Sequence, residues 1–352
     1  MASLPTYATL WHFLRPSLNS RVSFLGDLAV SLLLVVGTIV VVGALAIIRV
    51  ATRSAFRQRP DQVVIRRPGQ RMFGAPEPLG TTGIEDLPYA LLSQAAYRRK
   101  PDAKQVTDGE SLDPDSALQQ RGWVRWPDFG GSQLHTQIQQ VHLRAEVWWH
   151  FQQKKIAVAF GGTVFTNIKD WKANLRWFLP DQDDEYTVIV RSFGRAFEQE
   201  YANKVKEAGW QPCEPIRLFS TGHSLGGGLA QEFAYSLPPN DAIPRVAKVY
   251  AIDPSPVTGF YSVEKRVRDA NVQQLDIDRI FERGEILAFL RSIVSLFVPP
   301  RRKAPTIRQI RYNLFPTWNP ITGHSIAEFA FKLDEQLKRN GMTLASPAMA
   351  GR

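Results

Sequence analysis

The most distinctive pattern along the chain is an apolar run near the N-terminus, from Leu28 to Ile48, that contains no charged residue. A helix of about 20 apolar residues is long enough to cross the hydrocarbon core of a bilayer, where it satisfies its own backbone polar groups. Secretory signal sequences have shorter apolar cores, of about 7–15 residues. We therefore predict a single membrane-spanning helix over residues 28–48, preceded by an N-terminal segment of residues 1–27.

The charges that flank this run predict its orientation. Arg15 and Arg21 precede it, and a larger basic set follows it closely: Arg49, Arg53, Arg57, Arg59, Arg66, Arg67 and Arg71. Positively charged loops stay on the cytoplasmic side of a membrane. We therefore expect residues 49–80 to be a basic juxtamembrane linker beside the bilayer. The bulk of this single-pass membrane protein is then expected on the cytoplasmic side.

Beyond residue 80, short apolar stretches alternate with segments of helical pattern. The sequence predicts helices over residues 88–98, 193–208, 225–237 and 325–337, and strands over residues 141–151, 154–160, 216–220, 245–252 and 277–282. The first two strands are expected to form a hairpin about Gln152-Gln153. Alternating strands and helices are typical of a mostly parallel sheet covered by helices. We predict one α/β domain over residues 81–340 and a disordered tail over residues 341–352.

Composition and charge narrow the function classes. The 352 residues are 44% hydrophobic and 22% charged, which is ordinary for a globular protein. The single cysteine, Cys213, excludes an intrachain disulfide and a disulfide-stapled secreted scaffold. The formal net charge of +10 is concentrated in the arginine cluster that follows the apolar run. No zinc-ligand spacing or nucleic-acid motif accompanies it, so we expect no nucleic-acid partner.

A short motif in the middle of the chain predicts a nucleophile. Gly222-His223-Ser224-Leu225-Gly226 fits the pattern G-x-S-x-G between a predicted strand and a predicted helix. In this setting the serine lies on a tight turn whose flanking residues must be small. The N–H of Leu225, at the start of the helix, is then placed to bind an oxyanion. The motif therefore predicts that Ser224 is the nucleophile of an α/β-hydrolase fold.

A serine hydroxyl needs a general base, which is usually histidine. In α/β hydrolases the chain order is serine, acid, histidine. The chain has six histidines: His12, His135, His142, His150, His223 and His324. Only His324 follows Ser224 with room for an acid between them, and it precedes a predicted helix. His223 is adjacent to Ser224 and is expected to point elsewhere. The order therefore selects His324 as the base.

The acid of the triad has two candidates. Asp253 directly follows the predicted strand 245–252, and Glu285 follows the predicted strand 277–282. Functional side chains collect in the loops at the carboxyl ends of parallel strands. The residues by themselves leave Asp253 and Glu285 equally placed.

Residues 85–337 resemble the class 3 lipase family of α/β hydrolases. Ile156 to Thr163 (IAVAFGGT) is similar to that family's apolar strand followed by R-G-T/S, although Gly161 replaces the arginine. Similarities also occur at Asp170-Trp171 to Asn174 and at Ser255-Pro256 to Gly259. The resemblance implies that Thr163 supplies a second oxyanion-hole donor. It also implies that Glu285 is the acid, with Asp253 as the alternative.

These features together predict a serine hydrolase that acts on lipid acyl esters, as a lipase or phospholipase, through an acyl-enzyme. The chemistry requires no metal and no cofactor. Residues 170–179 (DWKANLRWFL) are expected to form a lid, with Trp171, Trp177 and Phe178 as candidate lid or substrate contacts. Residues 286–298 are either a second membrane-contacting helix or a core helix.

Two rival functions remain open at this point. The same triad could serve a thioesterase, an amidase or an acyltransferase, because fold and triad do not fix the leaving group or the acyl acceptor. Alternatively, the hydrolase-like domain could be a non-catalytic membrane protein that only binds a partner. The sequence indicates no particular protein partner.

Overall fold

The computed structural model describes residues 58–97, 112–126, 144–162, 185–210, 215–238, 243–255, 258–283, 300–315 and 322–342. The chain divides into two compact units, Met1–Arg57 and Gln58–Arg352, and every described residue belongs to the second unit.

The described residues form one nine-stranded sheet with the order β2-β1-β9-β8-β7-β6-β5-β4-β3. The central strands β5 to β9 are parallel to one another, and antiparallel strands flank them on both sides. The strands are β1 (Gln62–Arg66), β2 (Pro76–Pro78), β3 (Trp123–Trp126), β4 (Arg144–His150), β5 (Lys155–Gly161), β6 (Arg217–His223), β7 (Val246–Ile252), β8 (Asp276–Glu282) and β9 (Thr306–Tyr312). This arrangement confirms the predicted α/β class with a parallel centre.

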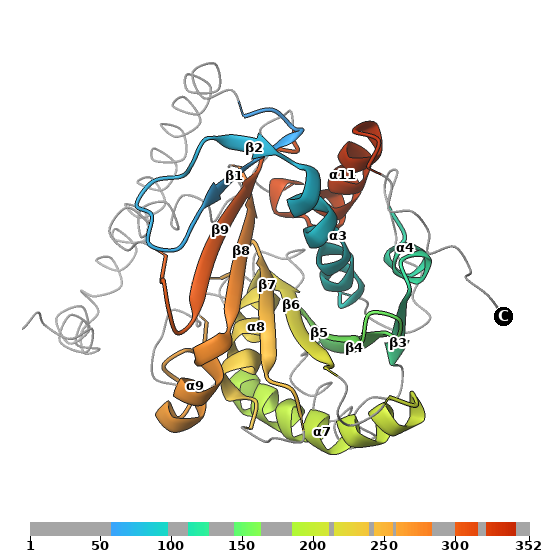
Figure 1. The fold of residues 1–352 in the computed structure, drawn as a ribbon, viewed down its shortest axis with the longest axis vertical. Helices are drawn as coiled ribbons and strands as arrows, with labels where there is room; N and C mark the ends of the chain where they lie inside the picture. The colour runs from blue at the N-terminus through green and yellow to red at the C-terminus, as the bar shows by residue number, and fades with distance from the viewer. Residues whose placement is uncertain are drawn as a thin grey trace, which may run out of the picture. The chain divides into compact units, whose positions relative to one another are not determined.

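Helices cover both faces of the sheet, as Figure 1 shows. One face carries α3 (Gly80–Ala95), α4 (Pro114–Gln120) and α11 (Ile326–Arg339). The opposite face carries α7 (Glu185–Glu207), α8 (Leu225–Ser236) and α9 (Lys265–Asn271). Two short 3₁₀ turns, η2 (Val272–Gln274) and η3 (Thr322–His324), precede β8 and α11.

Alternation along the strands divides the apolar core between the two faces. In β5, Ile156, Val158 and Phe160 belong to the cluster beneath α7 and α8, whereas Ala157 and Ala159 belong to the cluster beneath α3 and α11. All five side chains are buried. Because both faces of the strand are covered, it reads in the sequence as a continuous apolar run instead of an alternating one.

Most of the predicted elements around the centre of the sheet are present. β4 and β5 pair as an antiparallel hairpin, with His150 opposite Lys155, so the predicted turn at Gln152-Gln153 is confirmed. The predicted helix at residues 88–98 is longer toward its N-terminus than expected. It begins at Gly80 and continues through Pro88.

The predicted membrane-spanning helix is not supported, and the fold and single-pass localisation predictions are corrected on this point. Within the described ranges, no helix is both long enough and apolar enough to cross a bilayer. The apolar run at residues 28–48 lies outside those ranges. The membrane-spanning helix was predicted because residues 28–48 form an uncharged apolar run that is long enough to cross a bilayer.

The segment predicted as a basic juxtamembrane linker also differs from expectation. Within residues 49–80, the part from Gln58 onward contributes β1 and β2 to the sheet. The neighbouring arginines made this segment look polar in the sequence. Its apolar residues Val63, Val64 and Ile65 are nevertheless buried, which is why it forms a strand of the sheet. The predicted tail begins with Gly341 and Met342 packed after α11, and its remaining residues lie outside the description.

Candidate active site

Ser224 lies at the junction between β6 and α8, where the chain turns sharply. Its backbone has φ 56° and ψ −121°, a conformation that side-chain-bearing residues rarely adopt. Three backbone hydrogen bonds hold the turn: Ser224 N–H donates to the carbonyl of Ile252, and the Ser224 carbonyl accepts from Gly227 and Ser255. Strain of this kind is retained only where surrounding contacts enforce it, and it is typical of a nucleophile turn.

Gly226 explains why this turn needs small residues. A Cβ atom added to Gly226 would lie 2.1 Å from the carbonyl oxygen of Phe160 in the adjacent strand β5. No side chain fits at such a distance from a backbone atom. The absence of a side chain therefore lets α8 begin directly against β5, with Leu225 as its first residue.

His324 comes to Ser224 from the far end of the chain. It is the last residue of η3, and Ser325 then caps α11 by accepting a hydrogen bond from the N–H of Glu328. The Nε2 atom of His324 lies 3.1 Å from the Oγ atom of Ser224, and both side chains are buried. This distance is within the range expected for a base that takes a proton from a nucleophile.

Asp253 follows β7 and lies beside the same histidine. Its backbone has φ 41°, its N–H donates to the carbonyl of Ile280, and its Oδ1 accepts from the N–H of Glu282 at 3.3 Å. The side chain is 1% exposed. One of its oxygens lies within 4.8 Å of ring nitrogens of both His223 and His324. A buried carboxylate is therefore present beside the imidazole of His324.

His223 does not point away from the site as its position in the sequence suggested. Its ring lies 4.7 Å from the ring of His324, measured between centroids. The hydroxyl of Tyr97 lies 2.8 Å from Nδ1 of His223 and donates to the His223 carbonyl at 3.2 Å. Burial raises the pKa of the Tyr97 phenol, so the hydroxyl stays protonated at neutral pH. His223, Asp253 and His324 are also the described residues that could together hold a metal ion.

Sequence reasoning did not identify Tyr97 as a part of the site. The residue follows α3, and only the fold brings it from there to the end of β6. A single tyrosine at the end of an amphipathic segment carries no local signal of such a contact.

The end of β5 lies beside the start of α8, whose first residue, Leu225, is the predicted oxyanion donor. A Cβ atom built on Gly162 would lie 3.3 Å from the backbone nitrogen of Leu225. The backbone nitrogen of Leu225 therefore lies close to the backbone of Gly162. Thr163, the second donor implied by the family resemblance, is the next residue and lies outside the described residues.

Four other candidates also lie outside the described residues. They are Glu285 and the lid or substrate candidates Trp171, Trp177 and Phe178. The apolar segment at residues 286–298 also lies outside the described residues.

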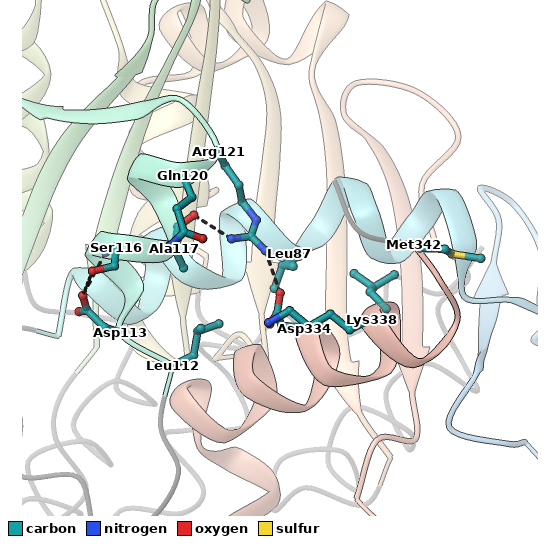
Figure 2. Close-up of a pocket in the computed structure, with 11 residues that line it drawn as sticks. Leu87, Leu112, Asp113, Ser116, Ala117, Gln120, Arg121, Asp334, Lys338 and Met342 are labelled. Atoms are coloured by element: carbon teal, nitrogen blue, oxygen red, sulfur yellow. Dashed lines mark hydrogen bonds and ion pairs between the residues drawn. The ribbon is translucent and has the colours of Figure 1, made fainter. Parts of the chain in front are cut away.

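A cavity of about 460 Å³ lies away from this site, between α3, α4 and α11. Figure 2 shows Arg121 and Asp334 paired across it, and their Nη2 and Oδ1 atoms are 2.8 Å apart. Lys338 also pairs with Asp334. None of Ser224, Asp253 and His324 lines this cavity, so its size does not make it the candidate active site.

Comparison with known proteins adds independent information about part of the chain. Residues 88–238 match a family model described as phospholipase-like, the Tle-like phospholipase domain. The matched range contains the nucleophile turn and ends before Asp253 and His324. It confirms the predicted resemblance to class 3 lipase-like α/β hydrolases and supports an ester hydrolase of lipase or phospholipase type. No curated protein sequence matches the chain.

Solved structures give weaker likenesses. A Rhizomucor miehei lipase–propeptide complex is 16% identical, with 61% of this chain and 65% of that chain covered and a TM-score of 0.38. This chain thus spans slightly less than two thirds of the Rhizomucor protein. Lipase II from Rhizopus niveus is 14% identical, with 62% and 78% covered and a TM-score of 0.40. Lip2 lipase from Yarrowia lipolytica is 13% identical, with 59% and 73% covered and a TM-score of 0.35. Likenesses of this size assign no activity.

Proposed function

Because residues 88–238 carry a lipase- or phospholipase-like hydrolase domain, we propose that the protein hydrolyses lipid acyl esters with Ser224 as nucleophile and His324 as base. The observation that carries this proposal is the distance of 3.1 Å between Nε2 of His324 and Oγ of Ser224. Serine is a poor nucleophile at neutral pH, and an imidazole at hydrogen-bond distance removes that obstacle.

The first half of the reaction forms the acyl-enzyme. Oγ of Ser224 attacks the acyl carbonyl carbon while its proton passes to Nε2 of His324. The carbonyl oxygen becomes an oxyanion that accepts a hydrogen bond from the N–H of Leu225, with the backbone of Thr163 as the second donor. When the oxyanion collapses, the ester C–O bond breaks, and the imidazolium returns its proton to the leaving alkoxide.

The second half releases the fatty acid. Water attacks the acyl carbonyl carbon and gives its proton to His324, and the tetrahedral intermediate collapses with Oγ of Ser224 as the leaving group. The proton then returns from His324 to Ser224. Every proton moves between the substrate, water and two side chains of this chain.

For the acid we propose Asp253, which stabilises the imidazolium of His324 while the proton resides there. Its burial and its position within 4.8 Å of the imidazole support this role, because a nearby negative charge is only weakly screened in a buried site. Glu285, which the family resemblance favours, is the alternative acid.

A fluorophosphonate probe tests the nucleophile. Wild type is expected to be labelled covalently, and Ser224→Ala is expected to remain unlabelled because the attacking hydroxyl is missing. Ser262→Ala, which removes an exposed hydroxyl outside the site, is the matched control and should label as wild type does. Labelling that persists in Ser224→Ala removes Ser224 from the mechanism.

A substrate panel tests the reaction class. Purified protein is offered a phospholipid, a triacylglycerol, a short-chain ester and an acyl thioester. Fatty acid released from the phospholipid or the triacylglycerol, and lost in Ser224→Ala, supports the lipid ester hydrolase. Turnover of the thioester alone would instead identify a thioesterase on the same residues.

A further inference from the structure

The buried cluster of His223, Asp253 and His324 has the composition of a metal site. Nitrogen or oxygen atoms of the three side chains all lie within 4.8 Å of one another. The side chains are 3%, 1% and 7% exposed, respectively. They come from the end of β6, from the residue after β7 and from η3, and backbone hydrogen bonds fix Asp253 in place. Two imidazoles and one carboxylate are a ligand set that zinc prefers.

The hydroxyl of Tyr97 orients the second imidazole of this cluster. The hydroxyl donates to the carbonyl oxygen of His223, and its oxygen lies 2.8 Å from Nδ1 of the same residue. With the hydroxyl proton on the carbonyl, Nδ1–H of His223 donates to the phenol oxygen. In that tautomer Nε2 of His223 carries the lone pair of the ring, which is the electron pair that a metal ion would bind. A histidine that binds a metal usually has its other ring nitrogen fixed in this way.

We propose that His223, Asp253 and His324 bind one Zn²⁺ ion, and that bound zinc inhibits the hydrolase because it takes the one lone pair of the His324 imidazole, which can then no longer accept the proton of Ser224. The inhibition rests on the proposed function, whereas the binding site does not. Tetrahedral zinc with ligands at about 2.0–2.1 Å separates those ligands by about 3.4 Å. The ligand atoms lie within 4.8 Å of one another, so each pair must close by no more than about 1.4 Å to bind the ion.

Zinc binding is measured on the full chain, purified without a histidine tag and stripped with chelator, by competition with a chromophoric zinc indicator. Wild type is expected to bind one equivalent. His223→Gln removes a ligand, and its affinity should fall by more than the 10–100-fold typical of a lost supporting contact. Tyr97→Phe removes such a supporting contact and should weaken binding by about 10–100-fold. His150→Gln, at a buried histidine in β4, should bind as wild type does.

Inhibition is measured as the zinc concentration that halves the rate of fluorophosphonate labelling, with chelator added afterwards to restore it. This concentration should rise in His223→Gln and Tyr97→Phe by the same factors as the dissociation constants. Because each variant is compared with its own zinc-free rate, a change in basal activity does not affect the result. If His223→Gln fails to fold, Tyr97→Phe and Asp253→Asn decide the binding test.

Two results separate the metal site from the hydrolase. Ser224→Ala should bind zinc as tightly as wild type, because Ser224 is not one of the proposed ligands. If wild type binds zinc but hydrolyses no lipid ester, the metal site is supported and the enzyme mechanism is overturned. If wild type hydrolyses lipid esters but neither binds zinc nor is inhibited by it, the metal site alone is overturned. Equal zinc affinity in wild type, His223→Gln and Tyr97→Phe also overturns it.

Discussion

Nε2 of His324 lies 3.1 Å from Oγ of Ser224, although 100 positions separate the two residues in the chain. The contact is made because Ser224 follows the carboxyl end of the interior strand β6, and the turn η3 returns the chain to that end of the strand just before α11. A hydrogen bond between residues so distant in sequence depends on the whole sheet between them. Mutations at either residue therefore test the chemistry and the fold together.

His324→Gln should abolish ester hydrolysis while the protein stays folded. Glutamine keeps a polar side chain of similar reach but cannot accept and return a proton, so kcat should fall by about 10⁴-fold or more. Initial rates on a phospholipid ester measure the loss, and a thermal melt checks the fold. His150→Gln is the matched control and should retain its kcat. A His324→Gln enzyme within tenfold of wild type contradicts the assignment of the base.

Asp253→Asn and Glu285→Gln distinguish the two candidate acids. Asparagine at residue 253 removes the buried negative charge beside His324, so kcat should fall by up to about 10⁴-fold while KM changes little. Glu285→Gln should have a much smaller effect. Paired measurements of kcat and KM on both variants decide between them. The reverse ranking would move the role to Glu285.

Gly162→Ala should impair the oxyanion site without removing any functional group. The added Cβ would lie 2.5 Å from the hydroxyl oxygen of Tyr97, 2.9 Å from the carbonyl oxygen of His223 and 3.3 Å from the nitrogen of Leu225, so it displaces the Tyr97 side chain as well. Crowding of the Leu225 N–H should lower kcat toward the 10²–10³-fold loss seen when an oxyanion donor is removed.

The matched control for this substitution is Gly194→Ala in α7, where an added Cβ meets its nearest neighbours at 3.9 Å and helix propensity favours alanine. Its kcat should equal that of wild type. Both rates are measured well below the melting temperature of each variant. Equal kcat in Gly162→Ala and wild type would exclude this part of the mechanism.

Asp86 makes stability depend on pH. Its carboxyl is fully buried in α3, accepts a hydrogen bond from the Tyr312 hydroxyl and lies near Asp278. Burial first, and then repulsion by Asp278, raises the pKa of Asp86 from 3.8 to about 8. The folded protein therefore holds a proton that the unfolded chain releases. This contribution to stability is complete below about pH 4 and is lost as pH rises through 8.

Asp86→Asn stays neutral at every pH, so it should gain stability relative to wild type as pH increases. The difference in unfolding free energy should grow between pH 5 and pH 8, by at most about 1.4 kcal/mol per pH unit. Urea unfolding of both proteins at several pH values measures this difference, and titrating groups that do not interact with Asp86 cancel. A difference that does not change with pH would show that the carboxyl is ionised in the folded protein.

The sequence was sufficient to predict the centre of the fold because local signals coincide there. The strand before Ser224, the small residues at Gly222 and Gly226, and the helix after Leu225 each restrict the same few positions. The order of histidines along the chain then left His324, and the structure brings it to Ser224. Both inferences use only the order and spacing of residues along the chain, which can be read without knowing the fold.

The edges of the sheet and the surroundings of the histidines could not be predicted in the same way. β2 consists of Pro76-Glu77-Pro78, and a segment with two prolines resembles a linker because proline donates no backbone hydrogen bond and is confined to sheet edges. The contact between Tyr97 and His223 joins residues 126 positions apart and leaves no periodic signal. Such features follow from the three-dimensional path of the chain.

The pairing of β1 with β9 fixes where the chain can be truncated. Val64, Ile65 and Arg66 lie opposite Arg311, Ile310 and Gln309, and Gln58 donates to the carbonyl of Arg311. A recombinant protein that begins at residue 81 would leave one side of β9 without its neighbour. Such an exposed strand edge recruits strands from other molecules and promotes aggregation. A fragment intended for crystallisation should therefore retain every residue from Gln58 onward.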